Sequence, residues 1–128
     1  MLSPDEFDRR VSADNVDYRV RLVLDHAKSN LTRDLSLTQL AALTNLSEWH
    51  ICRLFKKQLG ISPAQCIKLA RLKAASALLV NTTLSVKEVM ANVGMNDQSH
   101  FVRDFEVVFG CSPSTYRICS RNQKIVAL

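Results

Sequence analysis

One pattern of residues occurs twice in this chain, and this repeat limits the possible fold more than any other feature of the sequence. Six residues of the first copy recur fifty positions later. They are His50, Arg53, Phe55, Gly60, Ser62 and Pro63, which return as His100, Arg103, Phe105, Gly110, Ser112 and Pro113. Further upstream the offset is 49, because Leu37 and Leu40 match Val86 and Val89. This register indicates two copies of one supersecondary unit, the second with one additional residue in its turn.

Each copy opens with the signals of a helix start. The segments LSLTQL (35–40) and LSVKEV (84–89) have Ser at N-cap, Gln or Glu at N3, and apolar residues on both sides. This layout is typical of a capping box with a hydrophobic staple. We therefore predict short helices over about 37–44 and about 86–93.

A second helix is predicted to follow each short one. These helices begin near Ser47 and near Asp97, and they end at Gly60 and Gly110, where glycine suits the left-handed C′ position. The Ser-Pro pair after each glycine then starts a further helix. Two short helices joined by a tight turn form a helix-turn-helix, so the repeat predicts two such units.

Apolar periodicity predicts further helices over about 15–29, 63–80 and 113–120. Gly and Pro number three each, and no segment has the pattern of a strand. The predicted fold class is all-α, with about seven helices and two helix-turn-helix subdomains joined by a long central helix. The predicted segments are a loosely ordered N-terminal arm (1–14), the first subdomain (15–62), a linker helix (63–81), the second subdomain (82–120) and a C-terminal tail (121–128).

The charge of the chain favours a polyanionic partner. Lys and Arg total 17 against 12 Asp and Glu, which gives a net charge of +5 and a pI of about 9.3. Residues 53–73 carry six basic side chains and no acidic one. Nucleic acid is the first candidate and an anionic membrane surface the second, although ordinary surface charge alone explains the total equally well.

The sequence shows no signal peptide and no apolar run long enough to span a bilayer, so a cytoplasmic protein with reduced thiols is expected. The four cysteines form no CxxC pair and have no histidine at metal-ligand spacing: Cys52, Cys66, Cys111 and Cys119. They are interpreted mainly as small buried residues, and no metal or cofactor is predicted. No nucleophile, base and orienting group converge in the sequence, and no Gly-rich phosphate loop occurs, so we do not expect an enzyme.

The second helix of each unit has two distinct faces. In the helix over 48–59 the inner face comprises Ile51, Leu54, Phe55 and Leu59, and the outer face Trp49, Cys52, Arg53 and Lys56. In the helix that follows Asp97 the inner face comprises Phe101, Phe105, Val108 and Phe109, and the outer face Gln98, Ser99, Val102, Arg103 and Glu106. Such a helix fits the major groove, where Arg pairs with guanine, Gln with adenine, and an apolar group meets the thymine methyl.

Other basic residues are expected to contact phosphates, which positions a protein on DNA without specifying sequence. These phosphate candidates are His50, Lys56, Lys57, Arg71, Lys73 and Lys87. Alternatives stay open at this point. Arg53 and Arg103 can instead pair with acids such as Asp104 or Glu106, and Trp49 can belong to the core.

Both repeat units resemble the signatures of the AraC/XylS family. SEWHICRLFKKQLGISPAQ is similar to S-x-x-H-L-x-R-x-F-K-x-x-x-G-x-S-P, and VGMNDQSHFVRDFEVVFGCSPSTYR is similar to the second signature of that family. The resemblance covers about residues 16–119. It implies seven helices and two recognition helices that enter successive major-groove segments, about 34 Å apart. Carried over by position, the base-reading candidates are Trp49, Cys52, Arg53, Gln98, Ser99, His100, Val102 and Arg103.

The sequence departs from the family pattern at Met90, Met95, Cys66 and Glu106. The first three change packing, whereas Glu106 places negative charge on the second outer face in place of a lysine. We therefore predict that the first unit contributes more DNA affinity than the second.

The resemblance implies transcription regulation, with a lean toward activation through contact with RNA polymerase. An effector or dimerisation domain outside this chain is also possible on this resemblance. Two rival functions remain from the sequence: a thiol-based redox or alkylation sensor, and a basic module that binds an acidic protein.

Overall fold

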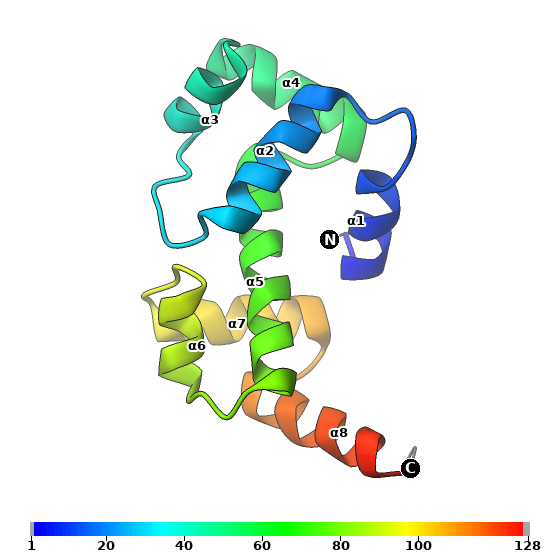
Figure 1. Cartoon of the computed structure of the whole chain (residues 1–128), viewed down its shortest axis with the longest axis vertical. Helices are drawn as coiled ribbons and strands as arrows, with labels where there is room; N and C mark the ends of the chain where they lie inside the picture. The colour runs from blue at the N-terminus through cyan, green and yellow to red at the C-terminus, as the bar shows by residue number, and fades with distance from the viewer. Residues whose placement is uncertain (1, 127–128) are drawn as a thin grey trace. The chain divides into compact units, whose positions relative to one another are not determined.

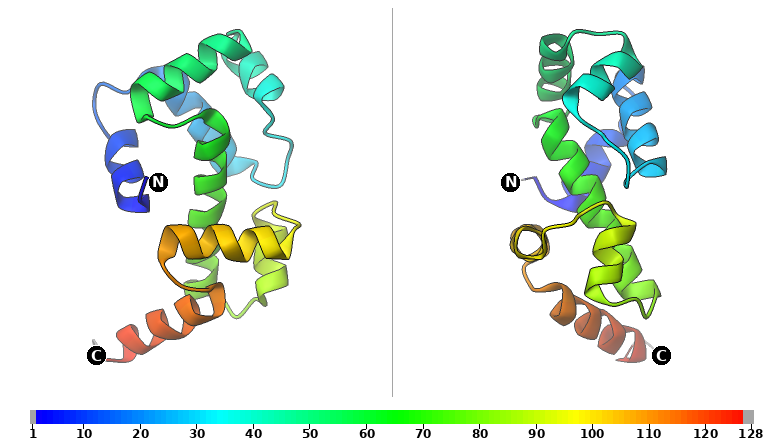
Figure 2. Two further views of the ribbon diagram at one scale, coloured as in Figure 1. Left: turned by 180° about the vertical axis from the view of Figure 1, so that it is seen from behind. Right: turned by 90° about the vertical axis from the view of Figure 1, so that its left-hand side faces the viewer.

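The computed structural model describes residues 2–126, with side chains up to residue 121. This part of the chain forms eight helices and no strand, which confirms the all-α prediction with one helix more than expected (Figures 1 and 2). The helices are α1 (Pro4–Val11), α2 (Tyr18–Ser29), α3 (Leu37–Thr44), α4 (Glu48–Leu59), α5 (Pro63–Asn81), α6 (Val86–Asn92), α7 (Gln98–Phe109) and α8 (Pro113–Val126). They belong to two compact units, the first unit up to Ala70 and the second unit from Arg71 on. The border lies within α5, and the five-segment division of the chain stays a prediction.

The prediction of a loosely ordered arm over 1–14 is wrong for residues 4–11, which form α1. Ser3 caps this helix, its hydroxyl accepting from the Glu6 amide at 3.2 Å, and Pro4 occupies the first turn. Phe7 is buried, and the Arg10 guanidinium donates to the carbonyl oxygen of Leu59 at the end of α4. Tertiary contacts therefore stabilise a helix of only eight residues, a length that is marginal in isolation.

The predicted starts of α3 and α6 are confirmed, with Ser36 and Ser85 as N-caps. The complete capping box is present at Ser85, whose hydroxyl and amide both pair with Glu88. At Ser36 the structure differs, because the Ser36 amide donates to the Asp34 carboxylate at 2.9 Å. The box predicted for the first unit is therefore replaced there by an aspartate on the N-terminal side of the cap.

Three other predicted ends shift. Helix α2 begins at Tyr18 with Asp17 as its N-cap, three residues after the predicted start, and α6 ends at Asn92. Helix α8 continues from Pro113 to Val126, so the prediction of a tail from residue 121 is wrong up to residue 126. Residues 127–128 of that predicted tail lie outside the described part. Helices α4 and α7 end as predicted, at Gly60 and Gly110, with φ of 78° and 81°.

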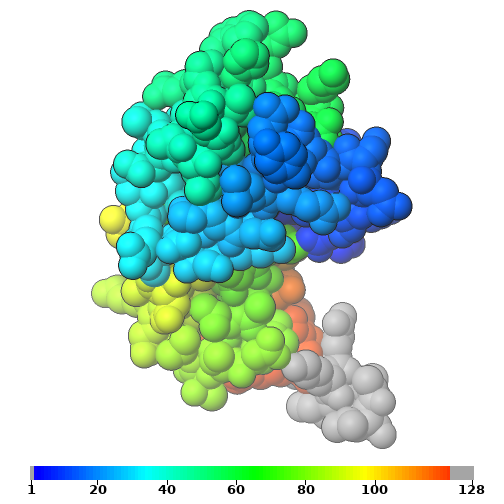
Figure 3. Space-filling view, turned by 45° about the horizontal axis from the view of Figure 1, so that its top comes forward, coloured from blue at the N-terminus to red at the C-terminus, as the bar shows by residue number. Residues whose placement is uncertain are grey.

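The first unit has a core contributed by α2, α3 and α4, with Phe7 of α1 also buried. Figure 3 shows the outer surface of this unit, coloured from blue to green. Its fully buried residues include Val20, Val23, Leu40, Ile51, Phe55 and Leu59. Burying one such side chain stabilises a fold by about 1.5–3 kcal/mol. The inner face predicted for α4 is confirmed, although Leu54 is partly exposed.

The second unit has an aromatic core. Phe101 and Phe105 of α7 are fully buried, and the Phe105 ring lies 4.5 Å from Phe109 and 5.4 Å from Tyr116 of α8, between ring centroids. Arg117 of α8 donates to the carbonyl oxygens of Leu79 at 2.9 Å and of Leu84. These bonds satisfy carbonyl groups at and after the end of α5, where the helix itself offers no donor.

Candidate nucleic-acid interface

The outer face of α4 carries the three residues predicted to read bases in the first unit, Trp49, Cys52 and Arg53, together with the phosphate candidate Lys56. Trp49 is 61% exposed, Arg53 and Lys56 are exposed, and Cys52 is half-buried between them. We call these four residues the α4 reading face. The exposure of Trp49 removes the alternative that it belongs to the core.

Three contacts order this face. The Arg53 guanidinium carbon lies 4.7 Å from the centroid of the Trp49 ring, within the range of a cation–π interaction. At the start of the helix, the Ser47 hydroxyl accepts from the His50 amide at 3.1 Å. The Trp49 and His50 rings meet edge to face, with 5.5 Å between the ring centroids. The Trp49 ring is thus contacted by both Arg53 and His50.

Helix α4 is also tied to its neighbours. The Thr38 hydroxyl of α3 donates to the Glu48 carboxylate at 2.9 Å, which joins the starts of the two helices of the helix-turn-helix. Asn45 between them adopts φ of 57°, the single positive φ outside glycine in the described chain. Asparagine tolerates this left-handed conformation better than most residues, and it allows the tight turn.

The α4 reading face borders a concave surface in the first unit. Its lining residues are Arg19, Leu46, Trp49, His50, Cys52, Arg53, Leu54, Lys56 and Lys57. Four of them are permanently cationic and none is acidic. The three phosphate candidates of the first unit all line this surface: Lys56, which belongs to the reading face, and His50 and Lys57.

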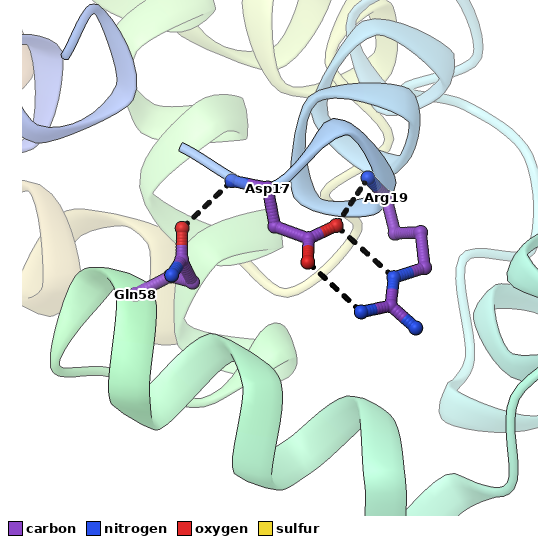
Figure 4. A network of polar contacts seen from close by, with 3 residues as sticks. All are labelled: Asp17, Arg19 and Gln58. Atoms are coloured by element: carbon purple, nitrogen blue, oxygen red, sulfur yellow. Dashed lines mark hydrogen bonds and ion pairs between the residues drawn. The ribbon is translucent and has the colours of Figure 1, made fainter. Parts of the chain in front are cut away.

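Arg19 is the one cation of this surface that the sequence analysis did not select. Its Nε and Nη2 atoms donate to the two carboxylate oxygens of Asp17 at 3.0 and 2.8 Å (Figure 4). The Asp17 amide donates in turn to the side chain of Gln58 on α4, at 2.7 Å. The Arg19 side chain, followed by its backbone amide, lowers the pKa of Asp17 by hydrogen bonding to the charged form.

The outer face of α7 carries the predicted residues of the second unit. Gln98, Ser99, His100 and Arg103 are exposed and Val102 is half-buried. The N-cap is Asp97, which accepts from the His100 amide at 3.0 Å. This bond lowers the pKa of Asp97. The ionised carboxylate places a negative charge at the start of the helix.

The two outer helices differ in charge. Helix α4 carries Arg53, Lys56 and Lys57 against Glu48 alone. Helix α7 carries Arg103 against Asp104 and Glu106, with Asp97 as an additional acid at the cap. Acidic side chains repel a polyanion, so the outer face of α4 is electrostatically the more favourable of the two for such a ligand.

The remaining phosphate candidates belong to the second unit. Lys87 is exposed on α6, whereas Arg71 and Lys73 are half-buried on α5. Arg71 and Lys73 both take part in interactions within the protein. The three residues are not part of the concave surface beside α4.

All four cysteines are free thiols. Cys66 is buried, Cys52 and Cys111 are half-buried, and Cys119 is exposed. The prediction of burial is therefore wrong for Cys119. Burial raises the pKa of the Cys66 thiol to about 12. Within residues 2–126 no group of three or more potential metal-ligating side chains comes together. None of the helices in this range has the length and apolar character that a membrane span requires.

Two helix-turn-helix units with outward polar faces and a basic concave surface define a DNA-binding type of domain. A family model described as a helix-turn-helix domain matches residues 40–118, more than half of the chain. Solved structures of AraC-family regulators share the fold. The chain belongs to the AraC/XylS-type family of helix-turn-helix transcription regulators.

Several curated relatives are transcription regulators. The chain is 33% identical over 102 residues to the uncharacterized HTH-type transcriptional regulator YfiF of Bacillus subtilis, covering 80% of this chain and 32% of that protein. It is 30% identical over 107 residues to the lactose operon transcription activator of Staphylococcus xylosus, covering 84% of this chain and 38% of the relative. It is 31% identical over 96 residues to the transcriptional activator AarP of Providencia stuartii, covering 75% of this chain and 71% of AarP. The chain thus spans about a third of the first two relatives and most of the third.

Two solved structures are similar over most of their length. The C-terminal domain of AraT, a response regulator from Geobacillus stearothermophilus, matches with a TM-score of 0.75 and 29% identity, covering 83% of this chain and 88% of that domain. The DNA-binding domain of the global transcriptional factor AdpA, solved in complex with a target DNA, matches with a TM-score of 0.72 and 27% identity. That match covers 87% of this chain and 96% of the AdpA domain.

Proposed function

We propose that this chain binds double-stranded DNA in a sequence-specific manner, with α4 and α7 in successive segments of the major groove, and thereby regulates transcription. The observation that carries the proposal is the form of α4 and α7 themselves. Each is twelve residues long, buries phenylalanine on one face and exposes a polar face that contains an arginine at the same repeat position. An exposed polar face of this length fits the width of the major groove.

The base contacts in this proposal come from the exposed faces. Arg53 and Arg103 pair with guanine, Gln98 with adenine, and Val102 or Cys52 meets a thymine methyl. Trp49, Ser99 and His100 complete the reading set. The phosphate contacts come from His50, Lys56 and Lys57 in the first unit, and from Arg71, Lys73 and Lys87 in the second.

The first unit is proposed to contribute more affinity than the second. The charges support this ranking, because α4 carries three cations and one acid, whereas α7 with its cap carries one cation and three acids. Each phosphate that a cation neutralises releases counterions and adds to the affinity. The second unit would then contribute mainly to sequence discrimination.

The partners beyond DNA follow from the family. We propose activation through RNA polymerase, because the relatives from Staphylococcus xylosus and Providencia stuartii are named activators. A DNA target implies the cytoplasm as the location. An effector or dimerisation domain outside this chain is proposed from the greater length of two of these relatives.

A thiol-based sensor is the alternative with some support. The bifunctional transcriptional activator and DNA repair enzyme AdaA of Bacillus subtilis is 29% identical to this chain over 105 residues, and the match covers 50% of AdaA. Cys66 is a poor nucleophile, because burial raises the pKa of its thiol to about 12. We propose that the chain is not an enzyme. If thiol labelling of the native protein at Cys111 or Cys119 changed DNA affinity, the sensor would be favoured. Labelling at Cys52 does not discriminate, because this residue lies on the reading face.

The experiment that tests the main proposal is selection of bound duplexes from a randomised library of ~20 bp, followed by salt titration of the winner and a scrambled control. Two enriched patches about ten base pairs apart, with affinity that falls steeply with salt, are expected. Enrichment of one patch alone would mean that the second unit contacts only the DNA backbone. Equal binding to every duplex, or stronger binding to an acidic protein than to any duplex, would contradict the proposal.

A further inference from the structure

The concave surface beside the α4 reading face contains a cation that does not come from the helix-turn-helix. Arg19 is the second residue of α2, which precedes the two helices of the motif. It lines the same surface as Arg53, Lys56 and Lys57, and no acidic side chain lines that surface. A concave surface of this charge attracts a polyanion.

Arg19 is held in place before any ligand binds. Two hydrogen bonds to the Asp17 carboxylate fix the plane of the guanidinium, and the Asp17 amide is bonded to Gln58 on α4 (Figure 4). The arginine is thereby fixed relative to the helix that carries the reading face. A side chain that is already ordered loses less conformational entropy when it binds.

Arg19 keeps donors for a ligand. A guanidinium has five N–H groups, and the two bonds to Asp17 use one on Nε and one on Nη2. The third guanidinium nitrogen points away from Asp17 in Figure 4. The side chain is 33% exposed, so these donors are within reach of a partner at the surface.

We propose that Arg19 is a further DNA-contacting residue, which donates to a backbone phosphate beside the major-groove segment that α4 enters. The contact extends the interface from the helix-turn-helix to the start of α2. Phosphate contacts of this kind fix the register of a protein on the duplex and are independent of sequence. The inference rests on the proposed function, because it needs α4 to lie in the groove.

The test compares Arg19→Gln with Arg9→Gln, each measured against the selected duplex and a scrambled duplex over a range of salt. Arg9 is an exposed arginine of α1 in the same unit, and it does not line the concave surface. Both variants remove one positive charge. The comparison therefore separates a phosphate contact from the effect of net charge.

We expect Arg19→Gln to weaken binding to both duplexes by about two- to tenfold, the change that corresponds to one ordinary hydrogen-bonded contact. The slope of log affinity against log salt should become shallower by about one. Arg9→Gln should change neither quantity by as much. Thermal unfolding of each variant, with binding measured where both are folded, removes any effect of the lost ion pair on stability.

The outcomes separate this inference from the proposed function. If wild-type protein prefers the selected duplex but Arg19→Gln and Arg9→Gln behave alike, Arg19 is a structural partner of Asp17 and this inference is overturned. If Arg19→Gln weakens binding to the selected duplex alone, the residue reads sequence and the phosphate assignment is wrong. If wild-type protein shows no preference among duplexes, the proposed function itself fails.

Discussion

The guanidinium of Arg53 lies over the indole ring of Trp49, with the Cζ atom 4.7 Å from the ring centroid. The two residues are one helical turn apart on the outer face of α4, and both are exposed. A cation–π pair at an exposed site contributes about 0.5–1 kcal/mol, which is too little to explain a tryptophan in solvent by stability alone. The pair is better explained as an arginine that the tryptophan orients toward a ligand.

Trp49→Ala should therefore affect DNA binding much more than folding. We expect the specific affinity to fall by about tenfold or more, as for a lost base-reading contact, while the midpoint of denaturant unfolding changes little. The check is a binding titration together with urea unfolding followed by circular dichroism. A loss of about 3–5 kcal/mol in the free energy of unfolding would instead place Trp49 in the core, contrary to its exposure.

The charge difference between the two outer helices gives a ranking of two matched variants. Arg53→Ala should reduce affinity for the selected duplex more than Arg103→Ala, since α7 already carries more acids than cations. Each loss should be about 1–3 kcal/mol if the arginine pairs with guanine. Glu106→Lys should raise affinity and steepen its salt dependence. A larger loss from Arg103→Ala at equal fold stability would refute the ranking.

Gly60 and Gly110 offer a second matched pair. Both have positive φ, so alanine at either position costs about 1–2 kcal/mol of backbone strain. A Cβ at Gly60 would also lie 2.6 Å from the Arg10 guanidinium, whereas a Cβ at Gly110 would meet no atom within 4 Å. Gly60→Ala should therefore be more destabilising, by about the value of the hydrogen bond from Arg10 to the Leu59 carbonyl, roughly 1.5–3 kcal/mol at most.

The control for this prediction is Arg10→Met. In that background the two alanine substitutions should cost the same in denaturant unfolding followed by circular dichroism. A difference that survives without the arginine would show that the strain of the backbone, rather than Arg10, distinguishes the two glycines.

The capping box of α6 predicts a pH dependence of stability. Hydrogen bonding to Ser85, first to its amide and then to its side chain, lowers the pKa of Glu88 below its usual 4.5. A carboxyl whose pKa is lower in the folded state stabilises the fold above its unfolded pKa, and this contribution is lost as the pH falls through the folded value. Glu88→Gln keeps an oxygen acceptor, so its thermal midpoint should fall less than that of wild-type protein below about pH 4.5.

Ser85→Ala is the comparison for this prediction. It removes the N-cap hydroxyl and should destabilise by about 1 kcal/mol at neutral pH, whereas Glu88→Gln loses there only the contribution of the charged carboxylate. Thermal scans at several pH values distinguish the two patterns. Parallel curves for wild-type and Glu88→Gln protein would show that the carboxylate contributes nothing to the acid sensitivity.

The faces of α4 and α7 were predictable because both helices are long enough for a 3.6-residue period to appear in the sequence. Phe55 and Phe105 are fully buried where that period places them, and Trp49 is exposed on the opposite side. The glycine ends were equally readable, since a left-handed residue is required there. Sequence patterns within one helix were therefore sufficient to predict its buried face and its C-terminal end.

Two of the features that were missed depend on residues far apart in the chain. Helix α1 has a readable start at Ser3 and Pro4, but its eight residues are too few for a period, and it is anchored by Arg10 to a carbonyl 49 residues away. Arg19 joins the concave surface through Asp17 and Gln58, which are separated by 41 residues. No local sequence pattern predicts a hydrogen bond between residues so far apart in the chain. The extension of α8, in contrast, was readable from the sequence, because no glycine or proline follows Ser120 to stop the helix.

The hydrogen bond from Arg10 to the Leu59 carbonyl makes the first repeat unit dependent on a residue outside the repeat. Gly60 and Gly110 close their helices with the same backbone conformation, yet at Gly60 alone an arginine from outside the repeat occupies the space next to the glycine. A fragment trimmed to begin at α2 would retain every residue of the motif and still leave the Leu59 carbonyl without this donor. Shortening the chain at its beginning would thus loosen the C-terminal end of α4, the helix proposed to enter the major groove. Grafting α4 into another scaffold would require Arg10 to be transferred with it.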